Sequence, residues 1–106
     1  MKISGKGVEF IKSLDGIFRK TLAYNDHLML CYFTLHKGSE VPIHSHKEHQ
    51  VGYVLRGKLK FMTENGNFIA KEGDSYIFNS YEKHGAIILE DSNVIDVFNP
   101  PREDYK

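Results

Sequence analysis

The chain lacks several features that define whole classes of protein. It has one cysteine, Cys31, in 106 residues, so an internal disulfide is excluded and a disulfide-stapled secreted domain is not expected. Fourteen Lys and Arg balance fourteen Asp and Glu, and no run of like charge exceeds two residues, which argues against nucleic-acid or basic membrane-surface binding. No apolar run approaches the ~20 residues of a membrane helix, and the N-terminus lacks a signal-type apolar segment. These absences predict a cytoplasmic protein with no membrane or nucleic-acid partner.

What the chain does contain is typical of a small globular protein. Hydrophobic residues make up 41% and charged residues 26% of the sequence, a balance that argues against disorder. The length leaves room for one hydrophobic core. We therefore expect a single domain over residues 1–106.

Glycine-containing pairs separate short runs rich in Val, Ile, Phe and Tyr. Glycine supplies positive φ at turns, and Asn-Gly is a strong hairpin signal. The turn pairs are Asp15-Gly16, Lys37-Gly38, Arg56-Gly57, Asn65-Gly66 and Glu72-Gly73. The predicted strands are Leu28–Leu35, Val51–Leu55, Lys58–Thr63, Asn67–Lys71, Ser75–Asn79, Gly85–Leu89 and Val94–Phe98. This spacing predicts an all-β sandwich or barrel, with residues 8–14 as a weak helical candidate.

One predicted strand is apolar on both faces. In Leu28–Leu35 both alternating sets of side chains are apolar, so both faces of the strand should be covered. Val51, Tyr53 and Leu55 form a second apolar row. A domain this small has one core, so the second face needs another cover. A homodimer interface would provide it, and the N-terminal residues are the alternative.

Histidines are the first candidate functional residues. His44 and His46 alternate within Pro42–Gln50, so in a strand both imidazoles point to one face and can share a cation. His84 could complete the site from a neighbouring strand. A bare His-x-His pair is weak evidence, and two nearby side chains compete: Glu48 has the same parity as the pair, and His49 has the opposite parity. His27 and His36 lie beside turns and are expected in solvent.

The surroundings of these histidines resemble the two sequence motifs of the cupin superfamily. The first runs through Gly38, His44-x-His46, Gln50 and Gly57, and the second through Gly73, Asn79-x-Tyr81 and His84. The resemblance implies a cupin-type double-stranded β-helix, a jelly-roll barrel over about residues 28–98 preceded by N-terminal strands in 1–27. It also implies one divalent metal held by His44, His46, the Gln50 position and His84. The chain departs from the pattern at Gln50, where many cupins have a carboxylate, and at Asn79 and Tyr81, where Pro and Gly are usual.

Gln50 changes the expected chemistry of such a site. Three imidazoles and a neutral amide oxygen leave a divalent cation its full charge, which favours anionic ligands and Lewis-acid catalysis. The set also lacks the carboxylate of the iron oxygenase triad. Alternatively, Gln50 hydrogen-bonds a ligand imidazole and does not coordinate. Imidazole and amide ligands suit Zn, Ni, Mn, Fe or Co without choosing among them.

The C-terminal segment 94–106 holds the other candidates. Asp96 lies among apolar residues, and because an unpaired buried carboxylate is costly it should have a partner or face a polar cavity. Phe98 shares its face. Pro100-Pro101 ends the strand, which could return Arg102 across the barrel mouth as a bidentate clamp for a carboxylate. Alternatively, Asp96 pairs with Arg102 or Arg19, Phe98 is ordinary core, and residues 102–104 are a solvated tail.

Taken together, the two segments are similar to the small pectin-degradation cupins of the KdgF kind. The similarity lies in Gln50-Val-Gly-Tyr-Val-Leu-x-Gly and in Asp96-Val-Phe-x-Pro-Pro-Arg-Glu-Asp-Tyr. It implies a metal-dependent enzyme that opens 4,5-unsaturated uronate monosaccharides to linear keto sugars, with Asp96, Phe98 and Arg102 at a small anionic sugar. A metal-dependent dioxygenase, a sugar isomerase and a non-catalytic sugar- or anion-binding cupin are the alternatives.

Overall fold

The computed structural model describes all residues, 1–106, and its regular elements are eight strands and two short 3-10 helices. This confirms the all-β expectation. The elements are η1 Gly5–Gly7, β1 Ile11–Leu14, β2 Ile17–Tyr24, β3 Met29–Leu35, β4 Glu40–His44, β5 His49–Thr63, β6 Gly66–Lys71, β7 Ser75–Phe78, β8 His84–Asn99 and η2 Glu103–Tyr105. The weak helical candidate at residues 8–14 was wrong, because β1 pairs with β2 across the Asp15-Gly16 turn. No helix is long and apolar enough to span a membrane.

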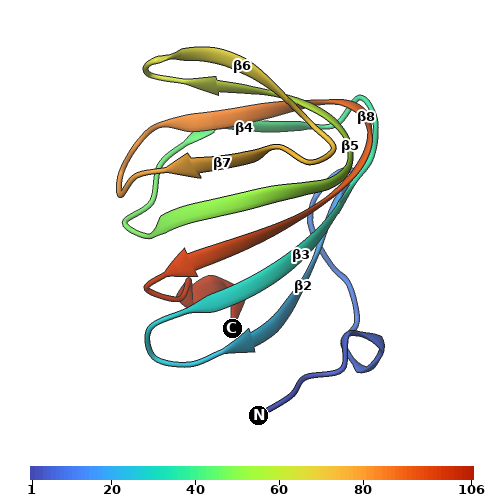
Figure 1. Cartoon of the computed structure of the whole chain (residues 1–106), viewed down its shortest axis with the longest axis vertical. Coiled ribbons are helices and arrows are strands. Elements are labelled where there is room, and N and C mark those ends of the chain that lie inside the picture. Colours follow the sequence, from blue (N-terminus) through green and yellow to red (C-terminus); the bar gives the residue numbers. More distant parts are fainter.

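Two long strands organise the barrel. All pairs are antiparallel, in the order β1-β2-β3-β8-β5-β6, while β4 also pairs with β8 and β7 with β5. Residues 49–54 of β5 pair with 94–99 of β8, and residues 59–63 of β5 pair with 84–88 of β8. Figure 1 shows β5 and β8 bending together, so that the sheet folds over on itself as a jelly roll.

The bend replaces the turn expected at Arg56-Gly57. Val51–Leu55 and Lys58–Thr63 belong to one strand, and register shifts between Val54 and Leu59 mark bulges instead of a reversal of the chain. Gly57 has φ +98°, and a Cβ there would collide with Ser92 on β8. The Ser92 hydroxyl donates to the Glu90 carbonyl and accepts from the Lys58 amide. Positive φ is therefore used here for a bulge.

The interior of the barrel is strongly apolar. Along β3, Met29, Cys31, Phe33 and Leu35 are buried, and the intervening residues are half-buried. Interior aromatics from the other strands are Phe61, Tyr76, Phe78 and Phe98. Inward-facing residues thus alternate with outward-facing ones, as the pleat of a sheet requires.

The outer face of one half of the barrel is also apolar. Val51 lies between Ile77 of β7 and Val97 of β8, and Val97 pairs in turn with Leu30. In the chain alone, Val51, Tyr53 and Leu55 are 44%, 43% and 41% exposed. The N-terminal segment covers part of this face, since Phe10 packs against Tyr32 at 6.1 Å between ring centroids. The β5 row stays uncovered.

Candidate functional site

Strand register brings three histidines together inside the barrel. His44 at the end of β4 is paired with His84 at the start of β8, and His46 follows in the loop before β5. The ring centroid of His84 lies 4.5 Å from that of His44 and 5.1 Å from that of His46. One nitrogen of each ring lies within 4.8 Å of those of the other two. The three imidazoles therefore converge on one point.

Backbone carbonyls fix the orientation of all three rings. The Nδ1 atoms of His44, His46 and His84 lie 2.9, 2.9 and 2.8 Å from the carbonyls of Pro42, Glu48 and Glu82. A carbonyl can only accept, so each Nδ1 carries the proton and donates, which leaves each Nε2 with a free lone pair. Hydrogen bonds of this kind typically orient metal-ligating histidines. The arrangement fits a divalent transition metal.

Burial also favours the neutral, ligating form of the rings. Loss of solvent lowers the pKa of His84 to about 4. Loss of solvent also lowers the pKa of His46, and the positive charge of Arg102 lowers it further. The Phe78 ring stacks on His84 at 4.2 Å with an interplanar angle of 7°. Both imidazoles therefore keep their lone pairs near neutral pH.

Gln50 extends this cluster from β5. Its Oε1 lies 3.1 Å from the Nε2 of His46, and its Nε2 donates to Asp96 Oδ2 at 3.1 Å. Because the proton of His46 is on Nδ1, the Oε1 atom of Gln50 and the Nε2 atom of His46 are two acceptors that face each other. A cation between or beside them satisfies both lone pairs, so the position of Gln50 suits a fourth ligand.

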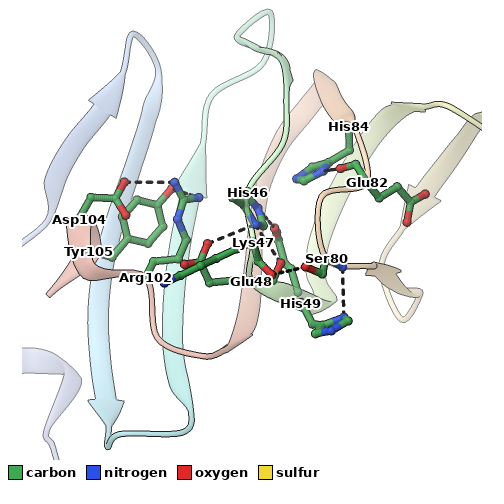
Figure 2. Close-up of polar contacts among 11 residues, drawn as sticks. His46, Lys47, Glu48, His49, Ser80, Glu82, His84, Arg102, Asp104 and Tyr105 are labelled. Atoms are coloured by element: carbon green, nitrogen blue, oxygen red, sulfur yellow. Dashed lines mark hydrogen bonds and ion pairs between the residues drawn. The ribbon is translucent and has the colours of Figure 1, made fainter.

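Glu48 and His49, the other two candidate ligands near His44 and His46, lie away from the point where the three imidazoles converge. Glu48 is buried on the Nδ1 side of His46, with its carboxylate 3.5 Å from that nitrogen, away from the point where the three rings converge. His49 is exposed, and its Nδ1 accepts from the Ser80 amide (Figure 2). His27 and His36 are exposed as expected.

Asp96 is buried, and its carboxyl group is hydrogen-bonded by Tyr76 and Gln50 and not by an arginine. Its side chain accepts from the Tyr76 hydroxyl at 2.6 Å and from the Gln50 amide. Burial raises the pKa of Asp96 to about 7, against the opposing effect of these two hydrogen bonds. Neither Arg102 nor Arg19 hydrogen-bonds it, so the alternative in which Asp96 pairs with one of these arginines is not observed.

Tyr76 was not anticipated from the sequence. On the sheet, Gly52 is paired with both Tyr76 and Asp96, and a Cβ on Gly52 would collide with both side chains. The glycine therefore lets the phenol reach across β5 to the carboxylate. One signal was available: a tyrosine with the parity of Phe78 is buried and needs a polar partner, as does Asp96.

Arg102 lies at the mouth of the barrel, held by the residues that follow it. Its guanidinium donates to the Tyr105 hydroxyl and to Asp104, both at 3.1 Å (Figure 2). It also stacks over the Tyr105 ring at 4.1 Å and lies 5.6 Å from the Phe98 ring centroid. The Arg102 guanidinium is therefore held in place on the barrel, whereas the side chains of Glu103 and Asp104 are exposed.

Six of the seven predicted site residues line one cavity, and His46 is the exception. The cavity lining of 21 residues, 14 of them hydrophobic, includes His44, Gln50, His84, Asp96, Phe98 and Arg102. Carboxylate, guanidinium and imidazoles thus converge on an otherwise apolar space, as in binding sites for small polar ligands.

Comparison with known proteins agrees with this architecture. Residues 31–98 match the family described as Cupin domain. The chain is 38% identical over 93 residues to the pectin degradation protein KdgF of Dickeya dadantii (strain 3937), which covers 86% of this chain and 84% of that protein. The solved structure of KdgF from Halomonas sp. is similar with a TM-score of 0.93 at 30% identity, over 100% of this chain and 98% of that one. An RmlC-like cupin from Shewanella frigidimarina has a TM-score of 0.91 at 30% identity over the whole of both chains. The chain therefore belongs to the cupin family, among the small cupins related to KdgF.

Proposed function

We propose that this protein opens 4,5-unsaturated uronate monosaccharides to linear keto sugars, without redox change, using a divalent transition metal. The observation that carries the proposal is that Asp96 and Arg102 line the same cavity as His44 and His84, two of the three converging histidines. The relationship to a pectin degradation protein at 38% identity supports the substrate class. We further propose a cytoplasmic site of action, in keeping with a single, unpaired Cys31.

The proposed metal site uses the Nε2 atoms of His44, His46 and His84 and the amide oxygen of Gln50. All four donors are neutral, so a bound cation keeps its positive charge and attracts an anionic substrate. When bound, the metal supplies Lewis-acid polarisation of a substrate hydroxyl, carboxylate or water. The identity of the metal among Zn, Ni, Mn, Fe and Co depends on availability as well as on these ligands.

Arg102 and Phe98 are assigned to substrate binding. A uronate carries its carboxylate on C5, next to the double bond, and the planar guanidinium of Arg102 can bind it through two parallel hydrogen bonds. Phe98, buried beneath Arg102 and facing the cavity, offers an apolar surface for the ring. Together they would hold C4 and C5 in a fixed orientation near Asp96.

Asp96 is assigned to proton transfer. In one route the bond from C1 to the ring oxygen breaks and the proton of the C1 hydroxyl is transferred to that oxygen, which leaves an aldehyde at C1 and an enol at C5. Protonation at C4 and loss of the enol proton then give the C5 ketone. In the other route water adds at C5 with protonation at C4, and the resulting hemiketal opens. Both routes need a group that delivers a proton to C4, and Asp96 is a buried carboxyl group that faces the cavity.

The test is a direct assay with a lyase-generated unsaturated monosaccharide. We expect the metal-loaded protein to remove the ultraviolet absorbance of the conjugated double bond, and the chelated protein to leave it unchanged. With metal added well above its dissociation constant, Asp96→Asn should lose most turnover, whereas His27→Ala, an exposed residue, should keep it. A sugar that raises the melting temperature but is recovered unchanged would contradict catalysis, and oxygen uptake would contradict the redox-neutral route.

We also propose that a second copy of the chain covers the apolar outer face. The support is the continuous row of Ile77, Val51, Val97 and Leu30 across four strands, because contiguous apolar surface on one face marks an interaction site. Light scattering after gel filtration should give a dimer that Val51→Lys dissociates. Ile69→Lys, at an equally exposed position on β6, is the control and should leave it intact. A monomeric wild type would refute the proposed dimer.

A further inference from the structure

We propose that Asp96 and Tyr76 are positioning residues that hold the Gln50 amide with its oxygen facing the three histidines. The inference rests on the metal site of the proposed function and adds a role for two residues that do not themselves contact the three imidazoles. It starts from a property of glutamine itself. The oxygen and nitrogen ends of its amide have nearly the same size, so packing alone does not choose between them.

The polar neighbours of Gln50 make that choice. Its Oε1 lies 3.1 Å from His46 Nε2 and its Nε2 lies 3.1 Å from Asp96 Oδ2. His46 donates through Nδ1 to the Glu48 carbonyl, so its Nε2 offers no proton and cannot hold the amide oxygen by itself. The carboxylate of Asp96 can only accept. It therefore holds the NH₂ end, and the oxygen turns toward the histidines.

Tyr76 holds the carboxylate in turn. The phenol donates to Asp96 Oδ1 at 2.6 Å and has no other polar side-chain partner, which leaves Oδ2 for the amide of Gln50. The strand positions paired with Gln50 are Phe78 and Phe98, and neither ring offers a hydrogen-bonding group that competes for the amide. Gly52 leaves the space that this contact needs. Asp96 thus accepts from both Tyr76 and Gln50, which leaves one orientation for the Gln50 amide, with Oε1 toward His46.

If the hydrogen bond between Asp96 and Gln50 is reversed in direction, the Gln50 amide should turn over. In Asp96→Asn, the new carbonyl accepts from Tyr76 and the new NH₂ faces Gln50. The Gln50 amide then turns over and donates to His46 Nε2, which occupies the lone pair that a metal requires. A glutamate at position 50 has two equivalent oxygens, so an oxygen faces the histidines in either orientation of the side chain. The effect of Asp96→Asn on metal binding should therefore depend on whether residue 50 is Gln or Glu.

The experiment measures Zn²⁺ affinity, without substrate, by competition with a chromophoric chelator. It compares wild type, Asp96→Asn, Gln50→Glu and the double variant, with thermal unfolding of the chelated proteins as the folding control. With Gln50 present, Asp96→Asn should weaken Zn²⁺ binding by about 10–100-fold, the range typical of residues that support metal ligands. In the Gln50→Glu background, the same substitution should leave the affinity unchanged or tighter. Tyr76→Phe should follow the same pattern with a smaller loss.

Three results would overturn the inference. They are equal losses from Asp96→Asn in both backgrounds, an unchanged affinity in Asp96→Asn alone, and a wild type that does not bind Zn²⁺. The uronate assay is separate from this measurement. If the uronate is not opened while the dependence on residue 50 is observed, the proposed reaction fails and the positioning role stands.

Discussion

The close approach of Tyr76 and Asp96 across Gly52 gives a sharp prediction for Gly52→Ala. The backbone of Gly52 is outside the left-handed region, so alanine adds no backbone strain. The added Cβ would overlap the phenol of Tyr76 and Oδ1 of Asp96. Tyr76 and Asp96 belong to the two strands that pair with β5 on either side of residue 52. The overlap with the new methyl group is therefore removed only if the two side chains move apart.

The expected loss of stability has two parts. Forcing an extra methyl group into a packed interior costs about 1–3 kcal/mol. Breaking a hydrogen bond to a charged group in the interior adds about 1.5–3 kcal/mol. We therefore expect Gly52→Ala to lower the free energy of unfolding by about 2.5–6 kcal/mol, a large part of the ~5–15 kcal/mol typical of a domain.

Urea denaturation of the chelated protein measures this loss. Gly7→Ala is the matched control, because its Cβ meets nothing within 4 Å and its φ is ordinary, so its effect should stay within about 0.5 kcal/mol. Zn²⁺ affinity should also fall in Gly52→Ala, since the carboxylate that orients Gln50 is displaced. A Gly52→Ala protein as stable as Gly7→Ala, with unchanged metal affinity, would refute this reasoning.

Three further predictions test other parts of the site and the core. Arg102→Lys should raise KM at least ~10-fold with a smaller change in kcat, because a point charge replaces a bidentate fork; an unaltered KM in steady-state assays would exclude the clamp. His84→Ala should abolish stoichiometric metal binding by elemental analysis, while His27→Ala should retain it; metal retained by both would place the ion elsewhere. Burial raises the pKa of Cys31 from 9.0 to about 11, so the folded protein keeps a proton that the unfolded chain releases, and stability falls as pH rises from 9 through 11. By pH 10.5 denaturant titration should show wild type losing about 2 kcal/mol more than Cys31→Ala; equal losses would contradict this.

Local sequence predicted the strands better than their continuity. Asn65-Gly66 lies at the β5–β6 hairpin as expected, with Glu64 and Asn65 between the strands and Gly66, at φ +117°, as the first residue of β6. Arg56-Gly57 carries the same signal but forms a bulge inside β5. A glycine with positive φ serves both purposes, and the choice depends on Ser92 of β8, which is distant in the sequence. Only the cross-strand packing distinguishes them.

The histidines show what spacing can and cannot determine. The alternation of His44 and His46 predicted a shared direction, and the structure places both beside His84. The Nδ1 contacts with main-chain carbonyls were not predictable, because they depend on loop geometry at Pro42, Glu48 and Glu82.

The acidic and basic residues depended still more on register. The requirement that Asp96 have a partner followed from its burial, but the partner is Tyr76 because β7 and β8 both pair with the strand that carries Gly52. For Arg102, the stiff Pro100-Pro101 turn was visible in the sequence. Its stacking on Tyr105 was not, since that contact requires the last turn of the chain to pack against β2.

The central claim is that one cation, held by three imidazoles and an amide oxygen, faces Asp96 and Arg102. Anomalous diffraction from crystals loaded with Ni²⁺ or Zn²⁺ tests it directly. We predict one fully occupied site per chain, at bonding distance from the Nε2 atoms of His44, His46 and His84 and from Oε1 of Gln50, with the Asp96 carboxylate and the Arg102 guanidinium on the same cavity. A metal on surface histidines such as His49, or no ordered metal at this position, would contradict the account.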